Sequence, residues 1–182
     1  IRDRAEAEAI ARALQAQGAP IVSFYPGAVW GPHNPTLGNQ ITTIFAMVEG
    51  GYYLSVEGGM PIVDARDLAA AVARSMVPGK GARRFMLAGH FRTHDQMRED
   101  ISALRGTPLW KAPIPGWLLR WAGRMGDRLR RVGFDPGAIT EEAMTIATSE
   151  WRGDDARTLA ELGLELRPIR ETVAAQMRWM YD

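Results

Sequence analysis

Residues 20–35 read Pro-Ile-Val-Ser-Phe-Tyr-Pro-Gly-Ala-Val-Trp-Gly-Pro-His-Asn-Pro and carry the strongest signal for the fold. An apolar run from Ile21 to Tyr25 is cut off by Pro26 and Gly27, which predicts a short buried strand followed by a rigid loop over residues 26–35. In open α/β sheets, ligands bind at the carboxyl ends of such strands. We therefore expect the loop 26–35 to be the first candidate for a site.

The segment before this stretch predicts a helix over residues 2–17, because it has no helix breaker and is rich in Ala, Glu, Arg and Gln. Its apolar face is formed by Ala7, Ile10, Ala11 and Leu14 at helical spacing. A glycine follows where a helix C-terminus favours a left-handed residue. Helix, glycine, strand and loop in this order form the second half of a βαβ crossover.

The composition limits the class of protein. The chain has 182 residues, 46% of them hydrophobic, enough for one well-buried domain or a domain plus a lobe. A net charge of +1 gives no reason to expect nucleic acid as a partner, and the lack of cysteine excludes disulfides and thiol chemistry. Without a long apolar run or a signal-peptide pattern, we expect a soluble, cytoplasmic protein. Because the chain starts at Ile1 inside a helix pattern, we also expect a piece whose beginning lies elsewhere.

Helical and strand patterns alternate through the rest of the chain. Helices are predicted at 39–49, after Asp64, at 94–105, 116–131, 139–148 and 155–162, and from Pro168 onward. Strands are predicted at 52–56, 61–63 and 83–87, with an edge strand at 108–115. In the helix at 94–105, Met97, Ile101 and Leu104 form the predicted buried stripe, and Thr93 with Gln96 forms a capping box.

Two polar clusters have an ordinary structural explanation. Asp64, Arg66 and Asp67 bring opposite charges together, and we interpret them as a helix cap with an ion pair. His90 and His94 are four residues apart, but a helix start is predicted between them, so we do not expect them to share a metal ion. The sequence predicts no metal site.

The helix predicted at 117–131 leaves two interpretations open. Trp117, Trp121, Met125 and Leu129 form one stripe, and a row of arginines lies beside it. Such a basic amphipathic helix can lie on a membrane surface. Alternatively, the apolar stripe packs on the core while the arginine side chains extend past it to water, and we prefer this interpretation.

Several ordered motifs resemble the C-terminal half of the extended short-chain dehydrogenase/reductases, the NAD-dependent epimerase/dehydratase family, in its dihydroflavonol-reductase-like branch. Residues 4–8, Arg-Ala-Glu-Ala-Glu, resemble the family's Ser-Lys-Ala-x-x-Glu helix. Residues 25–32, Tyr-Pro-Gly-Ala-Val-Trp-Gly-Pro, resemble its Arg-Pro-Gly-x-Val-Tyr-Gly-Pro, and residues 63–71 resemble its Val-Asp-Val-Arg-Asp-Val-Ala. Weaker matches at 113–117 and 155–163 extend the resemblance over nearly the whole chain.

The resemblance implies an α/β fold in which residues 1–182 supply the C-terminal part of a Rossmann-type doubly wound sheet and a small, mostly helical substrate lobe. In the family, a Tyr-x-x-x-Lys pair carries the catalysis. Arg4 falls at the lysine position, the tyrosine falls before Ile1, and the sequence has no Gly-rich phosphate-binding turn. This chain alone is therefore expected to bind a dinucleotide poorly and to be inactive.

Our first hypothesis is that the complete protein is an NAD(P)-dependent oxidoreductase or epimerase, with NAD or NADP as cofactor. The resemblance implies that Pro26, Gly27 and Val29 form a wall against the nicotinamide. A small-molecule substrate would bind over residues 26–41, with His33 and Asn39 as its contacts, and Tyr52, Tyr53 and the 117–131 helix would set specificity. The resemblance also implies a homodimer through helix 2–17. The alternative is a non-catalytic relative that acts as a cofactor-sensing or scaffold protein, which Arg4 at the lysine position favours.

Overall fold

The computed structural model describes residues 2–33, 39–134, 137 and 139–181, and the side chains of residues 2–4, 39 and 40 lie outside this description. The elements, in chain order, are α1 Arg2–Ala16, β1 Val22–Pro26, β2 Ala28–Trp30, α2 Asn39–Glu49, β3 Tyr52–Ser55, β4 Gly59–Asp64, α3 Ala65–Ser75, β5 Arg83–Leu87, β6 His90–Thr93, α4 His94–Arg105, β7 Trp110–Pro113, α5 Gly116–Arg131, α6 Glu141–Ala147, α7 Ala156–Leu162 and α8 Ile169–Tyr181.

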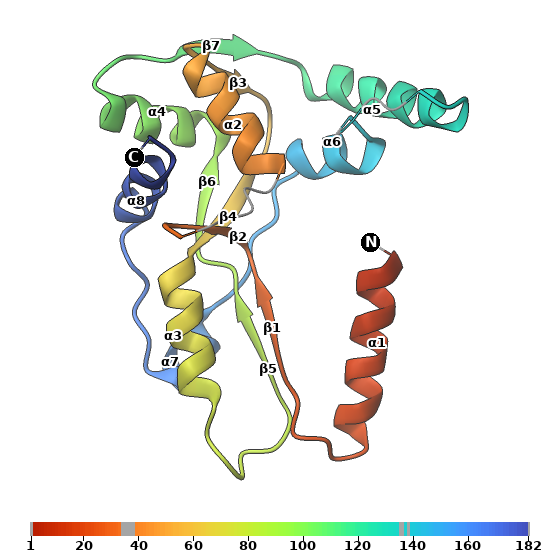
Figure 1. Ribbon diagram of the computed structural model, residues 1–182, viewed down its shortest axis with the longest axis vertical. Helices are drawn as coiled ribbons and strands as arrows, with labels where there is room; N and C mark the ends of the chain where they lie inside the picture. Colours follow the sequence, from red (N-terminus) through yellow and green to blue (C-terminus); the bar gives the residue numbers. More distant parts are fainter. Residues whose placement is uncertain (1, 34–38, 135–136, 138, 182) are drawn as a thin grey trace.

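The strands form three small sheets that follow one another along the molecule (Figure 1). β1 pairs in parallel with β5, β2 pairs in parallel with β4, β4 pairs antiparallel with β6, and β3 pairs in parallel with β7. The prediction of a loop over 26–35 was therefore wrong for Ala28–Trp30. These residues form a strand because their backbone pairs with Ile62–Asp64.

The two faces of β1 have different neighbours, because side chains alternate across a strand. Val22 and Phe24 pack against an apolar cluster beneath α3 and α7. On the other face, Ser23 accepts a hydrogen bond of 3.2 Å from Gln15 of α1, and Tyr25 bonds Glu8 of the same helix. The strand was predicted to be buried and is only half-buried. The reason is that, among the described residues, β5 is its one strand partner and α1 covers it mainly through polar contacts.

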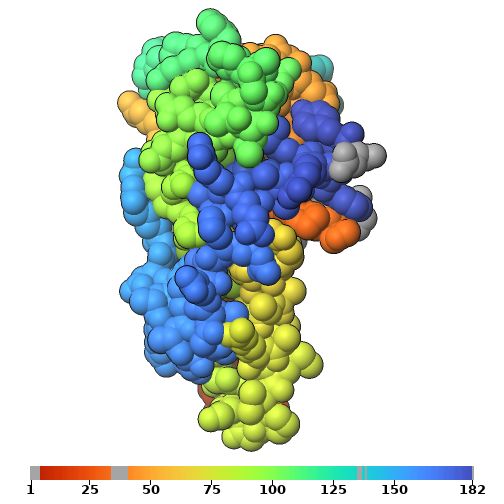
Figure 2. Space-filling view, turned by 90° about the vertical axis from the view of Figure 1, so that its left-hand side faces the viewer, coloured from red at the N-terminus to blue at the C-terminus, as the bar shows by residue number. Residues whose placement is uncertain are grey.

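Two apolar clusters hold the described chain together. The larger one joins α2, β4, α4 and α8 and includes the fully buried Trp30, Tyr53 and Ile62. The smaller one lies around β5, α3 and α7 and includes Phe85 and Leu87. Figure 2 shows α8 on the outer surface between α4 and α3. Its buried Gln176 accepts a 2.9 Å hydrogen bond from the backbone N–H of Gly31, which ties α8 to the end of β2.

Most predicted helices are confirmed, and so are their capping residues. The helix predicted at 94–105 is α4, and Thr93 and Gln96 form both hydrogen bonds of the capping box. Met97 and Ile101 are buried as predicted, but Leu104 is exposed, because it lies at the outer edge of the contact between α4 and α8. The strand β6 was not predicted, because it is short and carries polar residues.

The apolar stripe of α5 is exposed, so the prediction that it packs on the core was wrong. Trp117 is 64% exposed and Trp121 is 56% exposed. The buried positions of the helix are instead glycines, which allow a close approach to α6. Ile10 and Leu14 on the apolar face of α1 are exposed as well. Within the described part of the chain, no helix combines the length and apolar character needed to cross a membrane.

Candidate functional site

An open pocket of about 870 Å³ lies where α1 meets the carboxyl end of β1. Its lining comes from α1, β1, β5 and one distant segment, and consists of Ala5, Ala7, Glu8, Ser23, Phe24, Tyr25, Pro26, Gly27, Met86 and Trp151. The structure thus brings two of the predicted cofactor-binding residues, Pro26 and Gly27, into a concave surface. It is mainly apolar, with Glu8, Ser23 and Tyr25 as its polar side chains.

Glu8 and Tyr25 join α1 to β1 at this pocket. The Tyr25 hydroxyl donates a 2.5 Å hydrogen bond to Glu8 Oε1, which also accepts a hydrogen bond from Arg12. The bonds from Tyr25 and Arg12 lower the pKa of Glu8. Burial, and then the bond to Glu8, raises the pKa of Tyr25. Around neutral pH the carboxylate therefore stays ionised and the phenol stays protonated, so the pair positions α1 rather than exchanging protons.

Gly27 is required by the protein's own backbone. A Cβ atom built on this residue would lie 2.2 Å from the carbonyl oxygen of Ala88 and 2.7 Å from that of Pro61. Its N–H donates a 3.1 Å hydrogen bond to the carbonyl oxygen of Leu87. The resemblance implies that Gly27 lies against the nicotinamide, but the junction of β1 and β2 with β4 and β5 is by itself sufficient to require a glycine here.

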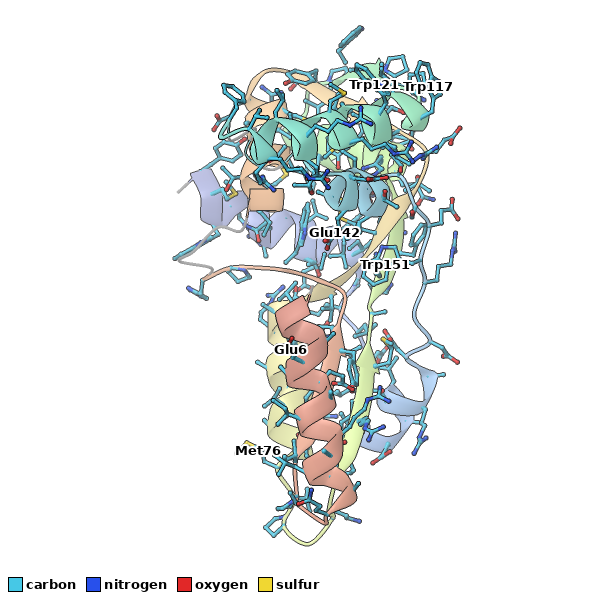
Figure 3. All side chains as sticks on the ribbon, turned by 90° about the vertical axis from the view of Figure 1, so that its right-hand side faces the viewer. Glu6, Met76, Trp117, Trp121, Glu142 and Trp151 are labelled. Carbon is cyan, nitrogen blue, oxygen red and sulfur yellow. The ribbon has the colours of Figure 1, made fainter. Side chains whose placement is uncertain are left out.

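Trp151 reaches the pocket because its segment is fixed to the end of β5. The carboxylate of Asp155 accepts hydrogen bonds of 2.6 Å from each of the backbone N–H groups of Ala88 and Gly89. A Cβ atom on Gly153 would lie 2.4 Å from the Cβ of Ala88, so glycine allows the segment to lie against the strand. Figure 3 shows Trp151 between the helical lobe and α1. Sequence reasoning missed Trp151 because only the tertiary fold brings it to the carboxyl end of β1.

The other predicted site residues lie elsewhere or outside the description. Val29 packs against the cluster beneath α3, and His33 has left-handed backbone (φ 65°) with its ring 4.9 Å from that of Trp179. Neither residue lines the pocket. Arg4 belongs to α1 and Asn39 to α2, but both side chains lie outside the described residues. Their predicted roles stay predictions.

The charged cluster after β4 is structural, as predicted. Asp64 is the N-cap of α3 and accepts a 2.8 Å hydrogen bond from the N–H of Arg66, whose guanidinium forms an ion pair with it. Asp67 pairs with Arg167 and thereby joins α3 to the segment before α8.

The histidines and the tyrosine of β3 likewise contact the protein itself. The ring of His90 lies 2.8 Å from the carbonyl oxygen of Arg167, and that of His94 lies 2.9 Å from the carbonyl oxygen of Ala147. Among the described residues, no group of three His, Asp or Glu side chains is placed to hold a metal ion. Tyr53, to which the resemblance gives a part in substrate specificity, is a core residue at 1% exposure, and burial raises the pKa of its hydroxyl.

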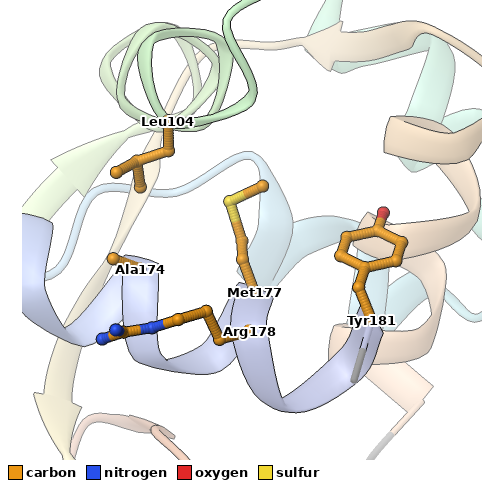
Figure 4. A pocket seen from close by; sticks show the side chains of 5 residues that line it. All are labelled: Leu104, Ala174, Met177, Arg178 and Tyr181. Atoms are coloured by element: carbon orange, nitrogen blue, oxygen red, sulfur yellow. The ribbon is translucent and has the colours of Figure 1, made fainter.

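A second pocket, of about 460 Å³, lies between α4 and α8 (Figure 4). Leu104 contributes from α4, and α8 contributes Ala174, Met177, Arg178 and Tyr181. It contains none of the predicted site residues. The pocket at the end of β1 is therefore the better candidate, because it lies at the strand end where α/β sheets bind ligands.

Comparisons with known proteins agree on the fold. No family model matches the chain. Sterol demethylase protein B of Methylococcus capsulatus is 27% identical over 170 residues, 91% of this chain and 51% of the relative. The crystal structure of gox2253 superposes with a TM-score of 0.75 at 22% identity, over 97% of this chain and 53% of that one. The UDP-glucose 4-epimerase of Bifidobacterium longum, in complex with NAD+ and UDP, has a TM-score of 0.64 at 16% identity, over 95% and 51%.

The predicted α/β, Rossmann-like fold class is thereby confirmed, and the chain resembles about one half of the fold of these solved structures. It spans about half the length of the curated relative and solved structures described above.

Proposed function

We propose that this chain is the C-terminal part of an NAD(P)-dependent oxidoreductase or epimerase of the extended short-chain dehydrogenase kind. It supplies the substrate lobe and the surface beside the nicotinamide. The observation that carries the proposal is the open pocket at the carboxyl end of β1, in a fold shared with an epimerase that was crystallised with NAD+. Pro26 and Gly27 then form the wall at the nicotinamide, and NAD or NADP supplies hydride transfer when bound.

The lining of the pocket suggests the substrate class. Pro26, Met86 and Trp151 offer apolar and aromatic surface, and Glu8 is the one charged group among the described lining residues. A nucleoside diphosphate needs cationic or N–H partners for its phosphates, whereas an apolar alcohol or ketone needs mainly apolar contact. We therefore propose that the reacting carbon is a carbinol of a largely apolar molecule. The name of the sterol-related relative agrees with this choice.

The second candidate function is a non-catalytic relative that senses the cofactor or acts as a scaffold. It rests on Arg4, which replaces the lysine of the family pattern. A guanidinium keeps the positive charge but not the compact ammonium geometry, so the replacement is not conservative. An enzyme and a cofactor sensor should both bind the nucleotide, but only the enzyme should turn over a substrate.

Full-length protein is titrated with NADH and NADPH, and binding is monitored by energy transfer from tryptophan to the nicotinamide. Turnover is then assayed with NAD+ and NADP+, by the nicotinamide absorbance for net oxidation and by chromatography of the products for epimerisation, which leaves the cofactor unchanged. A 3β-hydroxysterol and UDP-glucose serve as the two test substrates. Micromolar nucleotide binding with oxidation of the sterol supports the proposal. Turnover of UDP-glucose alone supports the enzyme but contradicts the apolar substrate class. Binding without turnover favours the sensor, and no binding rejects the cofactor.

A matched pair of variants tests whether the pocket is the site. Trp151→Ala removes an exposed tryptophan that lines the pocket, and Trp110→Ala removes an exposed tryptophan outside it. We expect Trp151→Ala to raise the nucleotide Kd or the substrate KM about fivefold, the size expected from the loss of one aromatic contact. Trp110→Ala should change neither. If the two variants had the same nucleotide Kd and substrate KM, the binding site would lie on another surface.

A further inference from the structure

One face of helix α5 packs closely against α6, and none of the described residues covers the opposite face. A Cβ atom on Gly123 would lie 2.6 Å from the carbonyl oxygen of Thr140, and one on Gly126 would lie 2.1 Å from that of Ile139. These glycines therefore fix the side of α5 that contacts α6. Since successive residues of an α-helix turn by about 100°, Trp117, Trp121 and Met125 point to the opposite side.

The outward face carries several exposed apolar side chains. Trp117 and Trp121 are both more than half exposed, and Leu118 and Leu129 are each 41% exposed. Figure 1 shows α5 at one end of the molecule, running across its long axis, and Figure 3 shows both tryptophans at this end. The helix can therefore lie flat against a surface without obstruction from α1 or α3. Apolar patches of this kind mark interaction sites.

The charge beside this surface is positive and partly unpaired. The helix carries five arginines and one acidic residue, Asp127. Asp127 faces α6, where it accepts a 3.0 Å hydrogen bond from the N–H of Glu141, and Arg124 pairs with the carboxylate of Glu141. Arg128 and Arg131 are exposed and form no ion pair with any residue that the structure describes. Their charge is available to an anionic partner.

We propose that the outward face of α5, with Trp117, Trp121, Leu118 and Leu129 as anchors, binds the surface of an anionic phospholipid membrane. Tryptophan rings favour the interface between headgroups and acyl chains, and arginines beside them attract anionic headgroups. A helix of 16 residues is about 24 Å long, less than the hydrocarbon core, so it lies on the membrane and does not span it.

Charge decides against a second copy of the chain as the occupant. A two-fold symmetric contact pairs a surface with itself. Such a contact would bring the arginine rows of two α5 helices together, and the helix offers no outward acidic residue to neutralise them. An anionic bilayer neutralises the same arginines while burying the tryptophans.

The test is co-sedimentation of full-length protein with vesicles of equal parts phosphatidylglycerol and phosphatidylcholine, compared with vesicles of phosphatidylcholine alone. We expect binding to the anionic vesicles, with a blue shift of the tryptophan emission, and weak binding to the neutral ones. Replacement of both tryptophans (W117S/W121S) should weaken the partitioning at least about tenfold, because the affinity for the membrane increases with the apolar area that is buried in it. Replacement of both unpaired arginines (R128Q/R131Q) should weaken it about 25-fold at low salt.

Each double variant has a control at a distant surface. M76S/V77S removes two exposed apolar side chains, and Figure 3 shows Met76 at the opposite end of the molecule. K80Q/R157Q removes two exposed positive charges. Both controls should bind as the wild type does, and all variants should keep the wild-type circular dichroism because the replaced side chains are exposed.

Three results would overturn the proposal. The first is no binding to anionic vesicles. The second is an equal loss of binding in W117S/W121S and in M76S/V77S. The third is a dimer in sedimentation velocity, without lipid, that W117S/W121S converts to monomer, because the face would then belong to a second copy of the chain.

Discussion

Helices α1 and α4 are both amphipathic, yet only α4 buries its apolar face. Ile101 of α4 is 1% exposed, within the cluster that joins α2, β4 and α8. Ile10 of α1 is 62% exposed, and α1 is attached to β1 and β5 through the polar side chains of Gln15 and Glu8. The strands differ in the same way, since β4 is buried throughout and β1 only half-buried. A helical period in the sequence therefore identifies the apolar face of a helix but does not specify whether another element covers that face.

The largest expected effect comes from the same substitution in the two helices. Ile101→Ala should lower the free energy of unfolding by about 2–5 kcal/mol, because it removes buried contacts and leaves a cavity. Ile10→Ala should change it by less than about 0.5 kcal/mol, because the side chain is already in water. Urea denaturation of both variants of the full-length protein measures the contrast.

A large loss in the free energy of unfolding on Ile10→Ala would contradict this difference between α1 and α4. It would mean that the apolar face of α1 is covered in solution, as the proposed homodimer through residues 2–17 requires. Dependence of that cost on protein concentration would then identify a second copy as the cover.

A smaller effect is expected at the joint between the buried strand β4 and helix α3. Burial alone would raise the pKa of Asp64, but its hydrogen bonds with Arg66 and Thr172 outweigh this and lower the pKa below its ordinary value. We expect Asp64→Asn to reduce the free energy of unfolding by about 1–2 kcal/mol at neutral pH, since an asparagine still caps the helix but loses charged hydrogen bonds.

The sign of the pH dependence follows from the lowered pKa. The stability that the ionised Asp64 contributes is complete above its unfolded pKa, near 4, and is lost as the pH falls through the folded value. The difference in the free energy of unfolding between the wild type and Asp64→Asn should therefore become smaller as the pH falls from about 5. Asp154→Asn, at an exposed carboxylate, is the control and should cost less than about 0.5 kcal/mol. A gap that widened in acid would contradict the assignment.

Local signals were sufficient to predict the helices and their caps. The capping box of Thr93 and Gln96 and the cap at Asp64 depend on residues within a few positions of each other. The sequence reasoning also found the carboxyl end of β1, because Pro26 and Gly27 interrupt an apolar run.

Tertiary neighbours could not be predicted in this way. Trp151 joins the pocket through Asp155, which bonds the backbone at the end of a strand more than sixty residues away in sequence. The stripe of α5 has a helical period that fits a core equally well, and only the glycine contacts with α6 show that it faces outward. Long-range packing decides both cases.

The smallest effect is expected at the polar contacts that attach α1 to β1. Of the two helices compared above, α1 is the one held less firmly. Glu8→Ala and Tyr25→Phe each remove the hydrogen bond between α1 and β1 from one side. Because few apolar contacts hold α1, we expect the amides of residues 5–16 to exchange with deuterium several-fold faster in either variant, while those of α4 are unchanged. The double variant should exchange no faster than the quicker single one, since both changes remove the same bond. Unaltered exchange in α1 would show that other contacts hold this helix, and the pocket between α1 and β1 would then not depend on the Glu8–Tyr25 pair for its shape.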